Sequence, residues 1–180
     1  MISYYSKMKI PEPHCNETVL LIVDVQNDFM PGGALAVPHG ELIVEPINKL
    51  MGEFDTIVAT QDWHFSNDES FASTHHVEPD YKTLWPDHCI AGTRGAEFHS
   101  LLDTSQVGHS IRKNGYSGYV SGLPHDVVIV GLATDYCVKH TAMDFAAAGH
   151  RVSVLLHCCR GIVAGAGIHE MANAGITIEE

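Results

Sequence analysis

The chain has 180 residues, of which 45% are hydrophobic and 18% are charged, a balance that suits one globular domain with a sizeable core. Its formal net charge of −12 argues against nucleic acid or an anionic membrane as a partner, because both are themselves negatively charged. No apolar run approaches the ~20 residues of a membrane span. The negative charge places no restriction on a neutral small-molecule substrate. It is also compatible with a homo-oligomer.

Cysteine usage bears on the compartment. The number of cysteines is odd, two of them are adjacent, and their spacing resembles no disulfide framework: Cys15, Cys89, Cys137, Cys158 and Cys159. Reduced thiols in a cytoplasmic protein are therefore expected. Residues 1–17 lack the apolar core of a signal peptide, and we expect a loose N-terminal arm on a single domain that spans residues 1–180.

The first expected element is a short apolar strand over residues 19–23, which ends at Asp24. A Pro-Gly-Gly sequence at residues 31–33 then breaks the chain. Residues 41–54 are expected to form a helix, because their apolar residues recur on one face. Pro46 within this stretch predicts a late start or a kink.

The middle of the chain is expected to add three strands, over residues 56–60, 107–113 and 126–130. Between the first two lies a polar, loop-rich stretch over residues 63–100 that contains both tryptophans. A stretch of that length is too long for a passive connector, so it is expected to carry function.

After the strand at residues 126–130, Thr134 and Asp135 are good N-cap residues for a helix over residues 135–148. The remaining expected elements are a strand, a short helix and an edge strand, over residues 151–156, 167–174 and 176–178. Alternating strands and helices predict an α/β fold, with a Rossmann-like parallel sheet flanked by helices on both faces.

Polar residues follow the carboxyl ends of the expected strands, where parallel sheets bind their ligands. Asp24 ends the first strand, Asp62 and His64 follow the second, Lys113 ends the third, and Cys137 follows the fourth. Each residue alone would more often be structural. Their common placement at one edge of the sheet predicts a site.

The residue types at this edge suit acyl transfer through a thioester. Cys137 is expected in the first turn of a helix, where the helix dipole and unpaired N–H groups lower the pKa of a thiol. Asp24 can serve as the base and later as the acid, and the charge of Lys113 can lower the pKa of both neighbours. The alternative is a small buried cysteine beside a structural Asp–Lys ion pair.

A second group of residues suits a metal ion. Asp62 and His64 are two residues apart, so an extended segment can bring both to one ion. The downstream candidates for a third ligand are His75, His76 and His88, with Cys89 as a second choice. A Trp-Pro sequence before His88 predicts a rigid turn that could fix this histidine.

Several long motifs occur along the chain: LLIVDVQNDFMPGGALAVP, ATQDWH, LWPDHCI, IRK and VGLATDYCVKHTAMD. In this order they closely resemble the nicotinamidases and pyrazinamidases of the isochorismatase-like cysteine hydrolase family, over about residues 19–161. The resemblance implies a Rossmann-like α/β fold. It also implies an amidohydrolase that converts nicotinamide to nicotinate and ammonia in NAD salvage.

The resemblance also implies roles for individual residues. The catalytic triad would be Asp24, Lys113 and Cys137. The metal ligands would be Asp62, His64 and His88, holding Zn²⁺, with Mn²⁺ or Fe²⁺ as alternatives. A cis peptide between Leu132 and Ala133 would turn the N–H groups of Ala133 and Cys137 toward an oxyanion. The substrate ring would contact Phe29, Trp85 and Tyr136.

Three features depart from the family pattern. The segment after Lys113, residues 114–125, is too short for the usual crossover helix, the segment after Ile162 is also short, and Asp68 stands where many members have a histidine. Two alternatives therefore stay open. One is another Asp-Lys-Cys amidase of the superfamily, acting on a carbamoyl or ureido substrate, and the other is a non-catalytic metal-binding remnant.

Overall fold

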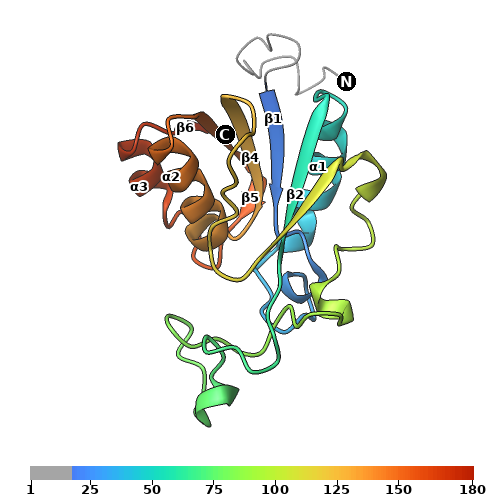
Figure 1. The fold of residues 1–180 in the computed structure, drawn as a ribbon, viewed down its shortest axis with the longest axis vertical. Helices are drawn as coiled ribbons and strands as arrows, with labels where there is room; N and C mark the ends of the chain where they lie inside the picture. The colour runs from blue at the N-terminus through green and yellow to red at the C-terminus, as the bar shows by residue number, and fades with distance from the viewer. Residues whose placement is uncertain (1–17) are drawn as a thin grey trace.

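A computed structural model describes residues 18–180, in which six parallel strands form one sheet in the order β3-β2-β1-β4-β5-β6 (Figure 1). The strands are β1 Thr18–Val23, β2 Thr56–Asp62, β3 His109–Lys113, β4 Asp126–Leu132, β5 Arg151–Arg160 and β6 Thr177–Glu179. The N-terminal arm expected over residues 1–17, with Cys15, lies outside the described residues. The expected parallel sheet is confirmed.

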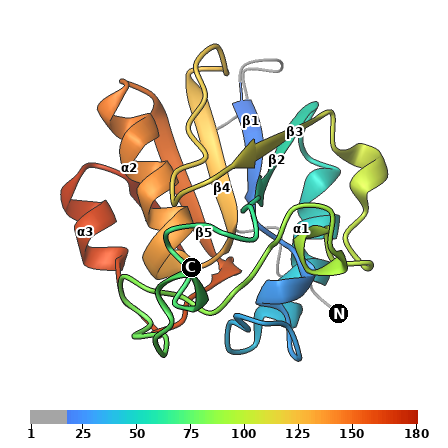
Figure 2. The same ribbon diagram turned by 60° about the horizontal axis from the view of Figure 1, so that its bottom comes forward.

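The helices cover both faces of this sheet, as the alternating pattern predicted. Helix α1 (Val44–Met51) packs on one face, and α2 (Lys139–Ala147) and α3 (Ile168–Asn173) pack on the other (Figures 1 and 2). Every residue of β1 after Thr18 is buried, which explains why this strand is a continuous apolar run without alternation. Within residues 18–180, no helix has the length and hydropathy needed to cross a lipid bilayer.

Several boundaries differ from the expected ones. The helix expected over residues 41–54 begins as a 3₁₀ turn, Gly40–Ile43, and becomes α-helical at Val44, with Pro46 in its first turn, where proline is tolerated. Strands β2, β4 and β5 extend beyond the ranges expected from their apolar runs, because main-chain pairing with a neighbouring strand continues past the expected ends. As a result Asp62 lies within β2.

The helix expected over residues 135–148 begins differently from the prediction. Its first turn, Thr134–Val138, is π-helical, and Ala133 occupies the N-cap position with no side-chain hydrogen bond. Thr134 and Asp135 are therefore not the cap. The Asp135 carboxylate instead accepts hydrogen bonds from the N–H groups of Ile162 and Val163, at 3.0 and 2.8 Å, and so ties this turn to the loop after β5.

Residues 114–125 connect β3 to β4 without a helix and lie beside α2. The Gly118 N–H donates to Thr141 Oγ1 at 2.9 Å, and the ring of Tyr119 lies 4.9 Å from that of Phe145. A Cβ atom at Gly118 would lie 2.6 Å from Thr60 Cγ2 of β2. The shortened connection thus covers the sheet through a close approach that only glycine permits.

The pairing of β1 with β4 depends on Gly131. This residue has φ of +121°, and a Cβ atom there would lie 2.1 Å from the Val23 carbonyl oxygen. We expect Gly131→Ala to lower the free energy of unfolding by more than ~3 kcal/mol, since backbone strain and a backbone clash both contribute. Urea denaturation measures the loss.

Gly149→Ala provides a matched control. Gly149 also has a positive φ, +91°, but nothing lies within 4 Å of its Cβ position. Gly149→Ala should therefore lower the free energy of unfolding only by the cost of the positive-φ backbone, about 1 kcal/mol. Equal losses in the two variants would show that close strand approach at Gly131 does not limit stability.

Candidate active site

The structure brings together the polar residues at the carboxyl ends of β1 to β4. The ammonium group of Lys113 is their common partner. Its Nζ lies 2.7 Å from Asp24 Oδ2, 3.2 Å from Asp62 Oδ1 and 3.4 Å from Cys137 Sγ. Pairing of β3 with β2 sets Lys113 opposite Asp62 in register, so the sheet itself positions this contact.

Asp24 is fully buried and has a left-handed backbone conformation, φ of 51°. Its Oδ1 accepts a hydrogen bond from Thr60 Oγ1 at 2.6 Å. Burial raises the pKa of Asp24 by more than the charge of Lys113 lowers it, and the negative charge of Asp62 raises it further. Asp24 is therefore a stronger base than a surface carboxylate.

Cys137 is 7% exposed, and its pKa differs from the sequence-based expectation. Burial raises the pKa of Cys137 well above its usual value, although the charge of Lys113 opposes this. The charges of Asp24 and Asp62, and a hydrogen bond to Asp24, raise it further. The direction of this shift is opposite to the lowering expected from the helix N-terminus.

Lys113 stays charged in this setting. Burial lowers its pKa, but Asp24, Cys137 and Asp62 together raise the pKa of Lys113 well above the ordinary value. Its Nζ also donates to the Gly115 carbonyl at 2.9 Å. Lys113 is thus a fixed positive charge at the centre of the site and not a proton donor at neutral pH.

Asp62, His64 and His88 form a buried cluster whose potential ligand atoms all lie within 4.8 Å of one another. Asp62 Oδ2 lies 3.0 Å from His64 Nε2 and 3.3 Å from His88 Nε2. In both histidines Nδ1 is taken by a protein oxygen, from Asp68 for His64 and from the Pro86 carbonyl for His88. One carboxylate and two oriented imidazoles fit a divalent ion of borderline softness.

The other proposed ligands lie elsewhere. His75 Nε2 is 2.9 Å from the Glu69 carbonyl oxygen, and His76 is an exposed residue that ends a 3₁₀ turn. Cys89 is buried, but it is not part of the metal-binding cluster. Of the three downstream histidines, the structure selects His88, which follows the Trp-Pro turn.

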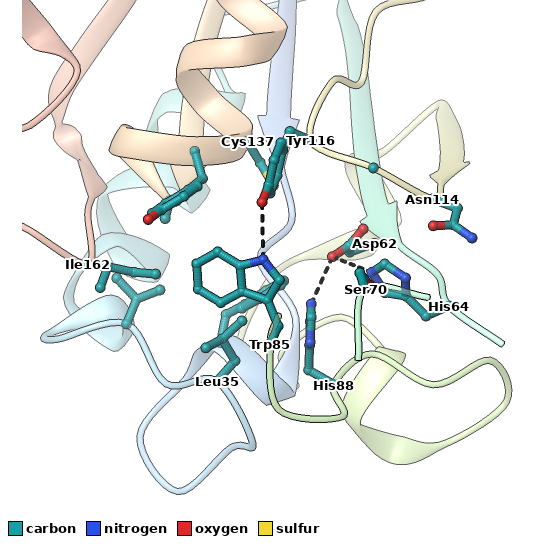
Figure 3. A pocket seen from close by; sticks show the side chains of 15 residues that line it. Leu35, Asp62, His64, Ser70, Trp85, His88, Asn114, Tyr116, Cys137 and Ile162 are labelled. Atoms are coloured by element: carbon teal, nitrogen blue, oxygen red, sulfur yellow. Dashed lines mark hydrogen bonds and ion pairs between the residues drawn. The ribbon is translucent and has the colours of Figure 1, made fainter. Parts of the chain in front are cut away.

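A cavity of about 290 Å³ lies against both groups. Figure 3 shows Asp62, His64 and His88 on one side of it, and Leu35 and Ile162 on the other. The lining residues are Phe29, Leu35, Val37, Asp62, His64, Ser70, Trp85, His88, Asn114, Gly115, Tyr116, Ala133, Tyr136, Cys137 and Ile162. The cavity is therefore mostly apolar, with a few polar groups in fixed positions.

The aromatic residues implied by the resemblance line this cavity. Trp85 Nε1–H donates to the Tyr116 hydroxyl at 3.1 Å, and the ring of Trp85 packs edge-on against that of Tyr136 at 5.0 Å. Phe29 also lines the cavity, and its ring packs against that of His88 with centroids 5.7 Å apart. Sequence reasoning missed Leu35, Val37 and Asn114, because a lone residue in a loop carries no periodic signal.

The turn between β4 and Cys137 has the backbone that the resemblance implied. The peptide bond between Leu132 and Ala133 is cis. Ala133 lines the cavity together with Cys137.

Comparison with known proteins gives a consistent result. The isochorismatase domain family matches residues 18–178. A nicotinamidase of Escherichia coli (strain K12) is 36% identical over 88% of this chain and 92% of its own length. A solved Acinetobacter baumanii nicotinamidase-pyrazinamidase superposes with a TM-score of 0.83 and 34% identity, over 93% of this chain and 97% of that one. The structure of a Pyrococcus horikoshii pyrazinamidase in complex with zinc superposes with a TM-score of 0.77 and 36% sequence identity, over 90% of this chain and 98% of that one.

Proposed function

The chain belongs to the isochorismatase domain family, and on that premise we propose that it hydrolyses nicotinamide to nicotinate and ammonia. One observation carries the proposal. A single cavity has the thiol of Cys137 and the Asp62-His64-His88 cluster in its wall, and Lys113 contacts both groups. A nucleophile and a metal site so close together suit a small aromatic amide that spans the distance between them.

In the proposed reaction, the Asp24 carboxylate accepts the proton of the Cys137 thiol while Sγ attacks the amide carbonyl carbon. The tetrahedral intermediate then expels the amine, which leaves as ammonia after taking the proton from Asp24. The resulting thioester is hydrolysed by a water whose proton Asp24 accepts, and the thiol is restored. Lys113 holds Asp24 in place, and the N–H groups of Ala133 and Cys137 are proposed to stabilise the oxyanion.

Asp62, His64 and His88 are proposed to hold the divalent ion, with Zn²⁺ the first choice and Mn²⁺ or Fe²⁺ as alternatives. When bound, the ion supplies a Lewis acid to which a neutral ring nitrogen can coordinate. Phe29, Trp85 and Tyr136 would fix the plane of the ring by aromatic contacts. Since the thiol supplies the nucleophile, the ion has a binding role.

Two other functions are less well supported. An amidase for carbamoyl or ureido substrates would leave the buried metal-binding cluster without a role. A non-catalytic remnant would have no reason to keep Lys113 within 2.7 Å of Asp24 and 3.4 Å of Cys137. Nicotinamide hydrolysis in NAD salvage uses both groups. The four cysteines within residues 18–180 are free thiols, which supports the proposed cytoplasmic location.

Ammonia release from purified protein tests the proposal. We expect kcat/KM for nicotinamide and pyrazinamide to exceed that for benzamide, which lacks the ring nitrogen, by ~10²-fold or more. Chelation of the metal should chiefly raise KM, because the ion positions the ring. Alkylation of Cys137 by iodoacetamide in the absence of substrate should continue.

The same assay has two outcomes that contradict the proposal. A similar kcat/KM for benzamide and nicotinamide would show that the ring nitrogen has no role in substrate binding. Loss of Cys137 alkylation on chelation, together with a fall in thermal stability, would make the ion structural. A matched control is His75→Ala, which removes an exposed histidine outside the cluster and should leave the ratio between nicotinamide and benzamide unchanged.

A further inference from the structure

The carboxylate of Asp68 lies at the opposite end of the His64 ring from the metal-binding cluster. Its Oδ2 is 3.0 Å from His64 Nδ1, while His64 Nε2 is 3.0 Å from Asp62 Oδ2. The two nitrogens of an imidazole point in different directions, so an ion held by Nε2 is out of reach of a carboxylate that faces Nδ1. Asp68 is thus placed to act on the histidine and not to ligate the ion.

Asp68 is itself held on both oxygens. Oδ1 accepts hydrogen bonds from the N–H and the hydroxyl of Ser70, at 2.9 and 2.6 Å. Oδ2 also accepts from Asn114 Nδ2 at 2.9 Å, and Asn114 directly follows Lys113 at the end of β3. The side chain is 11% exposed. The carboxylate therefore has a fixed position, set by the loop after β2 and by the end of β3.

The two histidines of the cluster differ in how they are oriented. His88 Nδ1 lies 2.7 Å from a main-chain carbonyl, that of Pro86, which is neutral. His64 Nδ1 faces a carboxylate. A charged acceptor strengthens the hydrogen bond and increases the electron density at the opposite ring nitrogen. His64 is therefore the histidine whose orientation and basicity depend on a replaceable side chain.

We propose that Asp68 is a positioning residue that fixes the ring of His64 with Nδ1–H toward the carboxylate, and thereby raises the affinity of the cluster for a divalent ion. This inference rests on the proposed metal site, but not on the identity of the amide that is hydrolysed.

The test is the affinity for Zn²⁺ alone, measured by competition with a colorimetric chelator. Asp68→Asn removes the charge but keeps an oxygen that can accept from Ser70, so the loop should persist. We expect the dissociation constant to rise about 10- to 100-fold, the usual effect of losing such a partner. Glu69→Gln is the matched control, because its side chain is 86% exposed and its change should stay within about twofold.

A second measurement follows the Nδ1 proton of His64 directly. In Zn²⁺-loaded wild-type protein, ¹⁵N NMR should show His64 coordinated through Nε2, with a slowly exchanging Nδ1–H. In Asp68→Asn that proton should exchange faster, while the corresponding His88 proton is unchanged. If Asp68 only stabilised the loop, its replacement would change the exchange rates of both histidine protons or of neither.

The outcomes separate this inference from the proposed function. Tight Zn²⁺ binding by wild type together with equal affinity in Asp68→Asn would overturn the inference and leave the metal site standing. Coordination of His64 through Nδ1 would also overturn it. Failure of wild-type protein to bind Zn²⁺ would overturn the inference and the proposed metal site together.

Discussion

Replacing Cys137 by alanine is expected to lower kcat for nicotinamide by about 10⁴-fold or more, because no thioester can form without the sulfur. The side chain lines the cavity and is only 7% exposed, so the loss of one sulfur atom leaves a small space within an existing cavity. The fold should therefore persist. Steady-state ammonia release, together with the urea midpoint, measures both effects.

Two variants sharpen this experiment. Cys137→Ser keeps the size and the hydrogen-bonding capacity of the side chain but supplies a weaker nucleophile, so it should stay largely inactive. Cys158→Ala is the matched control, since Cys158 is a fully buried cysteine of β5 that does not line the cavity. Cys158→Ala should lower the free energy of unfolding but leave kcat close to that of wild type.

Iodoacetamide labelling gives an independent readout of the same assignment. Among the four described cysteines, Cys137 lines the cavity, whereas Cys89, Cys158 and Cys159 are buried and are not among its lining residues. Burial raises the pKa of Cys158 and of Cys159 to about 12, and it also raises the pKa of Cys137, so access from the cavity and the neighbouring Asp24 carboxylate are what should make Cys137 react first. Retained activity in Cys137→Ala, or inactivation with the label on Cys158, would rule out Cys137 as the nucleophile.

The sheet was predictable because its strands are buried on both faces. Residues 19–23 and 127–130 are continuous apolar runs, and the structure buries both in the centre of the sheet. The carboxyl-end rule for parallel sheets then placed Asp24, Lys113 and Cys137 at one edge without knowledge of any long-range contact. That part of the site follows from chain order alone.

Other features depend on contacts between segments that are distant in sequence. The π-helical turn before α2 and the hydrogen bonds from the loop after β5 to Asp135 involve main-chain groups, which have no side-chain signature. The pKa of Cys137 is raised by burial and by two carboxylates from other strands. The position at a helix N-terminus alone therefore predicted a shift in the wrong direction. Residue types thus predicted which groups meet but not the electrostatic balance among them.

The second large effect is expected at Asp24. Asp24→Asn should lower kcat by ~10²-fold or more, the usual cost of losing a general base. The asparagine amide cannot accept the thiol proton, and the neutral thiol of Cys137 needs such an acceptor because burial raises its pKa. The rate of thioester formation in a single turnover should fall in parallel with the rate of Cys137 alkylation.

Asparagine fits this position without rearrangement, so the loss can be assigned to chemistry. Asp24 has φ of 51°, a conformation that asparagine tolerates well. The amide oxygen can face Lys113, and the amide NH₂ can donate to the Thr60 hydroxyl, which now lies 2.6 Å from Oδ1. Thr60→Val removes that hydrogen bond while it keeps the carboxylate, and it should lower kcat far less than Asp24→Asn. If turnover and alkylation in Asp24→Asn matched those of wild type, Asp24 would be a structural counter-ion of Lys113, and another group would have to take the thiol proton.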